Sequence, residues 1–225
     1  MAKHGKKYQE IVKKHTTTAM PIEQAVKEVK KSSYSKFVGT MELHVAINVP
    51  KEKDAKSIKG SIALPYPIAK SIKIAVITTP EKFDEAKKAG ADLVGLDEII
   101  KDVKAGKIDF DILVATPDVM PKIAILGKEL GPKGLMPNPR NGTVATDLTG
   151  TISEYKKGKM TFACDESGVM HFVVGKADME DQKIIDNVNA CIAKTAEIVA
   201  KPANQAIKTA HISVSMGLAN KIIVE

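Results

Sequence analysis

Aromatic residues are scarce in this chain of 225 residues, which has 5 Phe, 4 Tyr and no Trp. So few rings exclude a surface that binds nucleic acid by stacking many bases on aromatic side chains. Hydrophobic residues still make up 44% of the sequence, enough for a folded core rather than a disordered tail. The length allows one or two domains.

Cysteines and long uncharged runs are also few. The two cysteines, Cys164 and Cys191, form no CxxC pair, which argues against a disulfide scaffold and favours a reduced, cytoplasmic setting. The longest uncharged run, Thr209–Asn220, has 12 residues, well short of the roughly 20 that a membrane helix needs. The start of the chain is basic without an apolar stretch, so we expect neither a secretory signal nor a membrane partner.

Motifs for catalysis and cofactor binding are missing as well. The 5 histidines show no HExxH or other ligand-like spacing, and the sequence has no GxSxG elbow, P-loop or GxGxxG fingerprint. Carboxylates alternate with lysines over residues 81–118, which is typical of a solvated helical surface. We therefore predict no catalytic residue, no metal site and no cofactor.

The net charge of +7 is concentrated in one part of the chain. Residues 1–60 hold 13 Lys and 6 acidic residues (13 − 6 = +7), residues 61–158 have a net charge of +1 (14 − 13), and residues 159–225 have −1 (7 − 8). Clustered lysines suit a polyanion such as RNA, because they displace counterions from phosphates. A solvated lysine-rich face is the alternative, and charge alone does not separate the two interpretations.

The middle of the chain alternates between buried strands and helices. Thr-Pro steps at Thr79 and Thr116 indicate helix starts, with each threonine hydroxyl available as an N-cap. The order strand, helix, strand, helix, strand, helix implies parallel strands joined by right-handed crossovers, a Rossmann-like unit. The strands are expected at 71–78, 92–95 and 110–115, and the helices at 80–89, 96–105 and from Pro117 to about Leu130.

The two flanks show a different pattern. Apolar and polar residues alternate over 40–47, 160–165 and 209–216, which is typical of an antiparallel sheet with one open face. Amphipathic helices are expected at 21–31 and 181–200. Each flank supplies only part of a sheet, so we predict that both flanks pair into one α/β domain with the parallel unit inserted between them.

A loop rich in glycine and proline is the first candidate site. Residues 127–142 contain four Gly and three Pro, with Lys128, Lys133 and Arg140 among them. The loop is either a rigid basic element that lies on phosphates or an irregular connection that carries Leu135 and Met136 into a core. Composition slightly favours the connection.

Polar residues of the flanking strands are the second candidate. Phe37 could stack on a base, hydroxyls could bond 2′-OH groups, and Gly217 would let RNA approach the backbone. The alternative places Phe37 and Met216 in the core, which is the commoner fate of such residues. The candidates are Lys36, Phe37, Thr40, Glu42, Ser213, Ser215, Met216 and Gly217, with Lys3, Lys6, Lys7, Lys133 and Arg140 as auxiliary basic contacts.

The run GKELGPKGLMPNPRNGTV, residues 127–144, resembles the signature of ribosomal protein L-one, the bacterial-type stalk-protein family of the large ribosomal subunit. Three further blocks agree in order and spacing: KFVGTMELHVAINV at 36–49, DESGVMHFVVGKADM at 165–179 and ISVSMG at 212–217. The resemblance covers essentially the whole chain, and the sequence is identified as a member of this family.

The resemblance implies a discontinuous two-domain α/β fold. Residues 1–66 and 158–225 would form an rRNA-binding domain, a split α/β sandwich whose antiparallel sheet comes from both termini. Residues 67–157 would form an inserted Rossmann-like parallel α/β domain.

The resemblance also implies binding rather than catalysis. Family members bind large-subunit rRNA directly, form the mobile stalk and assist release of deacylated tRNA from the exit site; many repress translation of their own mRNA. The expected partners are therefore large-subunit rRNA, exit-site tRNA, the protein's own mRNA leader and the rest of the ribosome. We expect the protein in the cytoplasm on the ribosome, and as a monomer when free.

Mapped by motif, the family's RNA contacts fall on Lys36, Phe37, Thr40, Glu42, Gly168, His171, Lys176, Ser215, Met216 and Gly217. The sequence departs from the family at Ser215, which replaces a threonine and keeps the hydroxyl. Gly39 stands where family members often carry an acid, which lowers the rigidity expected of that strand. The alternative functions are a nucleotide- or small-molecule-binding Rossmann-like enzyme or sensor, and a general nucleic-acid chaperone.

Overall fold

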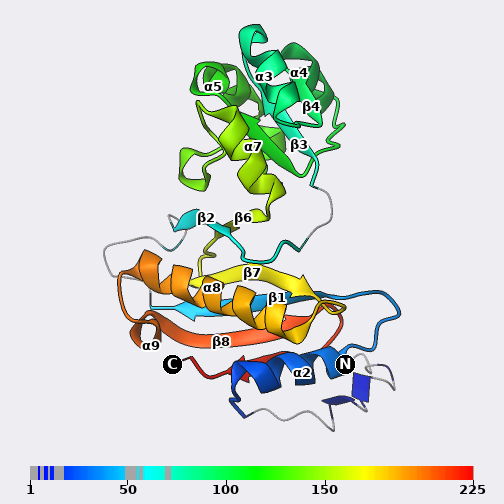
Figure 1. Ribbon diagram of the computed structural model, residues 1–225, viewed down its shortest axis with the longest axis vertical. Coiled ribbons are helices and arrows are strands. Elements are labelled where there is room, and N and C mark those ends of the chain that lie inside the picture. The colour runs from blue at the N-terminus through cyan, green and yellow to red at the C-terminus, as the bar shows by residue number, and fades with distance from the viewer. Residues whose placement is uncertain are drawn as a thin grey trace. The chain divides into compact units, whose positions relative to one another are not determined.

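The computed structural model describes residues 5, 8–9, 11–12, 18–48, 55, 58–68 and 72–224 (Figure 1). Contacts between residues divide the chain into two compact units. The first unit consists of Met1–Ile68 and Phe162–Glu225, and the second of Ala69–Thr161.

The first unit is built on a four-stranded antiparallel sheet with the strand order β7-β1-β8-β9. The N-terminal flank supplies β1, which pairs on both sides with strands of the C-terminal flank. The sheet therefore combines both flanks, as the alternating patterns predicted. Its strands are β1 (Thr40–Ile47), β7 (Val169–Lys176), β8 (Ile207–Val214) and β9 (Asn220–Ile222).

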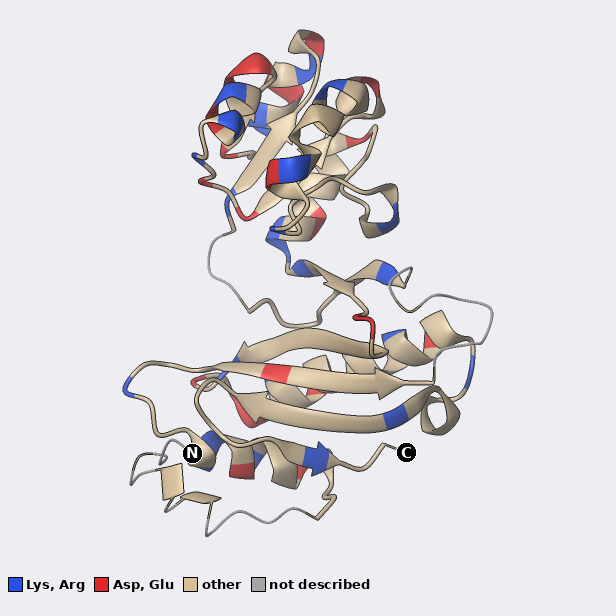
Figure 2. Ribbon diagram, turned by 180° about the vertical axis from the view of Figure 1, so that it is seen from behind, with Lys and Arg blue, Asp and Glu red and all other residues tan. Residues whose placement is uncertain are grey.

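Two amphipathic helices, α2 (Ile22–Ser32) and α8 (Asp181–Val199), cover one face of this sheet (Figure 1). Helix α2 contacts β8 and β9, and α8 contacts β1 and β7. A short helix, α9 (Ala203–Ala206), precedes β8. Figure 2 shows the opposite face of the sheet, over which no helix of the described residues lies. The stripe of α8 predicted to be buried is buried, namely Ile184, Val188, Cys191, Ile192, Thr195 and Val199.

The strand predicted at 160–165 forms, but in a sheet of its own. It is β6 (Lys159–Ala163), which pairs with β2 (Lys59–Ala63) as a two-stranded sheet. The chain turns back after β6 because the Asp165 carboxylate accepts a hydrogen bond from the Val169 amide at 2.7 Å. Alternation alone does not reveal such a reversal, since it says nothing about which strand is the partner.

The second unit contains a parallel sheet with the strand order β4-β3-β5, as the alternation of strands and helices predicted. Both faces of this sheet are buried, so its strands are continuously apolar. With the first unit's antiparallel sheet, it confirms the α/β fold class. The elements are β3 (Ile74–Ile77), η2 (Pro80–Lys82), α3 (Phe83–Lys88), β4 (Leu93–Gly95), α4 (Asp97–Lys104), β5 (Ile112–Ala115) and α7 (Leu148–Lys156).

The segment predicted as a helix from Pro117 to about Leu130 is helical over that range, but it is not one continuous α-helix. The segment forms short pieces of alternating type, partly because Pro121 offers no amide hydrogen to a continuous helix. The predicted helix starts are confirmed, because Thr79 and Thr116 are N-cap residues followed directly by proline. Neither threonine side chain makes a capping hydrogen bond, however, and the Thr116 hydroxyl lies 3.4 Å from that of Thr78. The pieces are η3 (Pro117–Val119), α5 (Met120–Ile123), η4 (Ala124–Leu126) and α6 (Gly127–Leu130), and η5 (Pro139–Asn141) follows.

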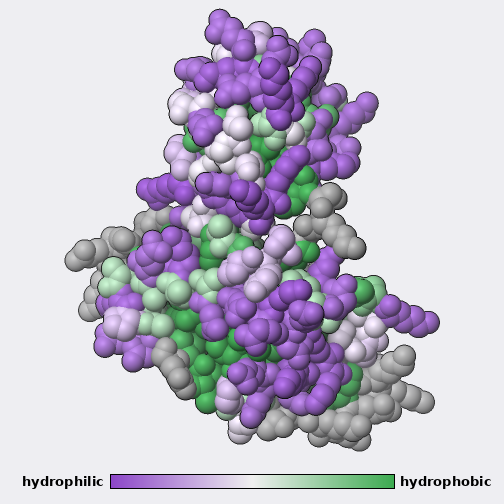
Figure 3. All heavy atoms as spheres, in the orientation of Figure 1, coloured by the Kyte–Doolittle hydropathy of each residue, from purple (hydrophilic) through white to green (hydrophobic). Residues whose placement is uncertain are grey.

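The helices of the second unit present mostly hydrophilic residues on the face seen in Figure 3, which agrees with the solvated surface expected over residues 81–118. Across the part of the chain that the structure describes, no helix combines the length and the apolar composition needed to span a bilayer.

Candidate nucleic-acid interface

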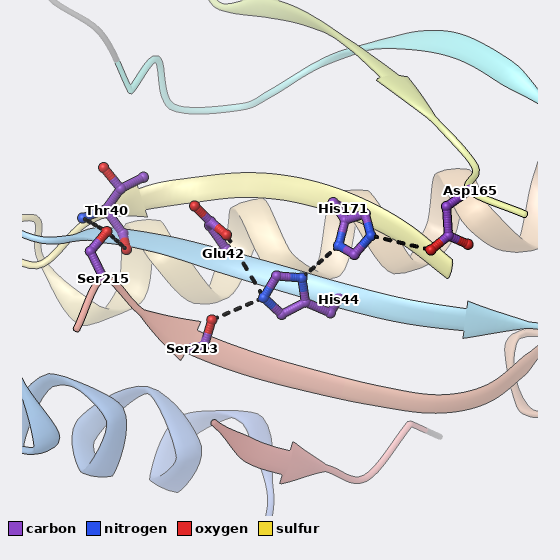
Figure 4. Close-up of polar contacts among 7 residues, drawn as sticks. All are labelled: Thr40, Glu42, His44, Asp165, His171, Ser213 and Ser215. Carbon is purple, nitrogen blue, oxygen red and sulfur yellow. Dashed lines mark hydrogen bonds and ion pairs between the residues drawn. The ribbon is translucent and has the colours of Figure 1, made fainter. Parts of the chain in front are cut away.

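The uncovered face of the four-stranded sheet carries the polar half of each alternating strand. Thr40, Glu42 and His44 lie on this face of β1, while the residues between them are buried under the helices. The strand register brings further polar residues beside them (Figure 4). Lys176 is opposite Thr40, Ser213 is opposite Glu42, and both His171 and His211 are opposite His44.

At one end of this face, two segments far apart in the sequence meet. Lys36 and Phe37 precede β1, and Ser215 follows β8 directly. The Ser215 amide donates to the Thr40 carbonyl at 2.9 Å, and the Thr40 amide donates to the Ser215 hydroxyl at 3.2 Å. The serine that replaces the family's threonine is thus held by the backbone of β1.

Phe37 and Met216 are both exposed beside this junction, with 60% and 57% of their surface accessible. The alternative that placed them in the core is therefore wrong. Strand β8 ends at Val214, and Met216 adopts a positive φ of 65°, which turns it away from the strand's alternation. A large apolar residue held in that conformation on the surface is unusual enough to suggest a binding role.

Two glycines are required here by close approach. A Cβ atom on Gly217 would overlap Val214 Cγ1 and lie 2.8 Å from the Ser32 hydroxyl. A Cβ atom on Gly39 would lie 2.8 Å from Val214 Cγ2. Gly39 is therefore packed closely against Val214. The close packing does not indicate the lower rigidity that was expected because Gly39 replaces the acid of other family members.

Three histidines form a row across β7, β1 and β8. The Nδ1 atoms of His44 and His171 are 2.8 Å apart, and His44 Nε2 lies 3.0 Å from the Ser213 hydroxyl. Burial, followed by the nearby His171, lowers the pKa of His44, while Glu42 acts in the opposite direction and His211 adds to the lowering. His44 and His211 were not among the predicted site residues. The alternation of their strands placed them with the polar residues, but only the register shows that they meet His171.

The remaining predicted residues lie farther from the exposed pair. Gly168 precedes β7, and its carbonyl accepts a hydrogen bond from the amide of Ile47 at the far end of β1. An eight-residue strand is about 25 Å long, so Gly168 and Thr40 mark opposite ends of the face. Lys3, Lys6 and Lys7 lie outside the described residues.

The glycine- and proline-rich loop belongs to the second unit. Leu135 and Met136 pack against the apolar cluster that contains Ile123 and Leu126, which confirms the interpretation of the loop as a connection. Lys133 and Arg140 are exposed. Their assignment as auxiliary RNA contacts stays a prediction.

The open face gathers hydroxyls, imidazoles, lysines, the Glu42 carboxylate and two exposed apolar side chains. Both cysteines are buried, and burial raises the pKa of the Cys191 thiol to about 12, which leaves it protonated and unreactive at neutral pH. Within the described ranges, no three His, Cys, Asp or Glu side chains gather in a way that could hold a metal ion.

Comparison with known proteins identifies the family. The sequence matches the ribosomal protein L1p/L10e family over residues 10–218. The large ribosomal subunit protein uL1 of Fervidobacterium nodosum is 40% identical over 222 residues, which cover 96% of this chain and 94% of that protein. The protein of the same name from Macrococcus caseolyticus is 38% identical over 226 residues, covering 99% and 97% of the two chains. The protein uL1c of Trieres chinensis is 44% identical over 169 residues, covering 75% and 74%.

The chain therefore belongs to the ribosomal protein L1p/L10e family, as the motifs predicted. Members of this family are structural proteins without enzymatic activity, so the enzyme alternative is excluded.

Proposed function

We propose that the protein is a constituent of the large ribosomal subunit and binds rRNA directly through the open face of its four-stranded sheet. The names of its relatives support the first part, since they are large-subunit proteins that match the chain over almost its whole length. The junction of β1 and β8 supports the second. There, Phe37 and Met216 are exposed together with polar groups that come from distant parts of the sequence.

The chemistry of this face suits folded RNA. The Thr40 hydroxyl can donate to and accept from a 2′-OH group, and Glu42 can accept from a 2′-OH or a base amino group. The hydroxyls of Ser213 and Ser215, which already bond His44 and the Thr40 backbone, can accept from a 2′-OH group. Phe37 supplies one stacking surface, which agrees with recognition of a folded RNA rather than of many unstacked bases. Lys36 and Lys176 add charge for phosphates at the same end of the face.

We propose further that the two compact units are the two domains that the sequence predicted, the first binding rRNA and the second inserted between its halves. From the family resemblance we also propose assistance in release of tRNA from the exit site, and repression of the protein's own mRNA through its leader. The protein would act on the ribosome in the cytoplasm and be a monomer when free.

The substitution Met216→Asp tests the rRNA interface. Aspartate tolerates a positive φ better than most residues, so the turn should persist while a negative charge meets the RNA. We expect specific affinity for a large-subunit rRNA fragment to fall about tenfold or more, measured by filter binding at fixed salt. The matched control is Ile125→Asp, which places the same charge on a residue of the second unit that is 67% exposed. Equal affinities of wild type and Met216→Asp would remove Met216 from the interface.

The ratio of affinities for the rRNA fragment and for random RNA of equal length tests the function as a whole. A large ratio at fixed salt is expected, whereas a general nucleic-acid chaperone would show a ratio near one. Replacing Lys3, Lys6 and Lys7 by glutamine should weaken binding to all RNAs alike and reduce the salt slope by about one for each lysine that contacts a phosphate. An unchanged slope would show that these lysines do not contact phosphate.

A further inference from the structure

The histidine pair, His44 and His171, occupies the middle of the face proposed to bind RNA. The exposed fractions of the two side chains are 29% and 54%, so both rings remain accessible from solvent. The rings meet edge to face with their centroids 5.0 Å apart. The titratable and charged groups around the pair are Glu42 on β1, His211 on β8, Asp165 before β7, and Lys221 on β9, which is opposite His211.

The pair shares a single proton between its two Nδ1 atoms. At 2.8 Å, one Nδ1 must donate and the other accept, since two N–H groups facing each other would repel. A carboxylate oxygen faces the outer nitrogen of each ring: Asp165 Oδ2 lies 3.8 Å from His171 Nε2, and Glu42 Oε2 lies 3.8 Å from His44 Nε2. The Ser213 hydroxyl lies 3.0 Å from His44 Nε2, and it donates or accepts according to the tautomer of that ring. Full protonation of both rings therefore requires the pair to separate.

In the protein without RNA, the surroundings disfavour that second proton. Burial and the neighbouring His171 and His211 lower the pKa of His44, and Glu42 opposes them only in part. The net direction is toward neutral imidazole at neutral pH.

We propose that RNA binding at this face is coupled to proton uptake by the His44–His171 pair. Phosphate and 2′-hydroxyl oxygens placed over the row accept hydrogen bonds, so both rings can turn outward and donate once they are charged. Protonated His44 also donates to Ser213 Oγ and frees the serine hydroxyl to donate to RNA. The inference rests on the proposed rRNA interface, and it adds His44 to the residues that contact the RNA.

The sign of the effect follows from linkage. Bound RNA stabilises the charged form of the pair and raises the pKa of His44 above its lowered value in the free protein. Affinity therefore increases as the pH falls through the interval between the free and the bound pKa. A shift of one pKa unit corresponds to about tenfold in affinity.

The experiment measures binding of the full-length protein to a large-subunit rRNA fragment by fluorescence anisotropy, at constant ionic strength, between about pH 5.5 and about pH 8. We expect the wild type to bind about tenfold tighter at the acidic end. The double variant His44→Gln/His171→Gln should lose this dependence. The control variant His4→Gln/His15→Gln removes two histidines that belong to none of the strands β1, β7 and β8, and it should keep the dependence. A wild-type affinity that does not change with pH would overturn the proposal. A pH dependence that is lost in His4→Gln/His15→Gln but kept in His44→Gln/His171→Gln would also overturn it.

Titration of the histidine C2 protons by NMR gives a second readout that does not depend on the variants' stability. In the wild type, the pKa of His44 should be higher in the RNA complex than in the free protein, and an unchanged value would contradict the proposal. The two proposals fail differently. Specific binding that is equal at every pH overturns only the proton coupling, whereas absence of specific binding at every pH overturns the rRNA interface as well.

Discussion

The turn that presents Met216 depends on Val214, whose two methyl groups lie against Gly39 and Gly217. A Cβ atom on Gly217 would overlap Cγ1 of Val214, and one on Gly39 would lie 2.8 Å from Cγ2. Val214 is 3% exposed and β-branched, so its side chain has few other rotamers into which it could move. The substitution Gly217→Ala should therefore disturb the packing around Val214 and lower the stability of the first unit.

The magnitude follows from opposing effects. Forcing a methyl group into a packed site costs about 1–3 kcal/mol. Replacing glycine by alanine also stabilises the folded state by about 0.4–1 kcal/mol, because alanine lowers the conformational entropy of the unfolded chain. Gly217 is not among the residues with positive φ, so no conformational cost is added. We expect a net loss of about 1–2 kcal/mol in the free energy of unfolding.

Urea unfolding followed by circular dichroism measures this loss, and a double-mutant cycle assigns its cause. In a Val214→Ala background the obstructing methyl group is absent and the 2.8 Å approach to the Ser32 hydroxyl remains, so Gly217→Ala should cost about 1 kcal/mol less than in the wild type. Gly127→Ala is the matched control, because Gly127 is helical and a Cβ atom added to it would meet nothing within 4 Å. An equal cost in both backgrounds would refute the steric argument.

Four further predictions concern buried or bridging side chains. Burial raises the pKa of Tyr155 to about 12. Folding stability should therefore fall as the pH rises from about 10, where the tyrosine of the unfolded chain ionises, to about 12. The midpoint of urea unfolding, measured across this range, should fall more in the wild type than in Tyr155→Phe. Tyr155→Phe should also cost about 1 kcal/mol at neutral pH through loss of the hydrogen bond to the Asn141 carbonyl. Cys191 should react with a thiol reagent at about pH 8 only after denaturation, since burial raises its pKa to about 12. Lys30→Met should lower stability by about 1 kcal/mol, because Lys30 joins α2 to α8 through Asp181 at 2.6 Å; thermal unfolding with Lys31→Met as control measures it.

Much of the fold could be predicted from periodicity. The alternation over residues 40–47 and the stripe of α8 were right residue by residue, because each reports burial on one face of one element. The parallel order of the second unit followed from strand and helix spacing. The helix predicted after Pro117 failed because local pattern does not show how often a segment exchanges α-helical for 3-10 hydrogen bonds.

The candidate site was predictable as a set of residue types but not as a geometry. Phe37 and Met216 read as core residues by their apolar character, and their exposure is decided by a turn whose shape depends on Val214. The histidine row depends on the register of β1 with β7 and β8, two strands that lie more than a hundred residues from β1 in the sequence. Register is set by long-range packing, so single-sequence reasoning could place His44 on the polar face but could not join it to His171.

Charge and shape make separable contributions to the proposed interface. The basic excess of the chain lies within residues 1–60, whereas the open face sets Lys36, Lys176 and Lys221 against Glu42 and Asp165. A face whose charges nearly cancel attracts polyanions only weakly, so its discrimination among RNAs has to come from hydroxyls, shape and the exposed apolar pair. Proton uptake by the histidine pair would then add positive charge to the open face itself. Acidification should therefore strengthen binding to the specific rRNA site more than binding to random RNA, whereas a general electrostatic effect would strengthen both alike.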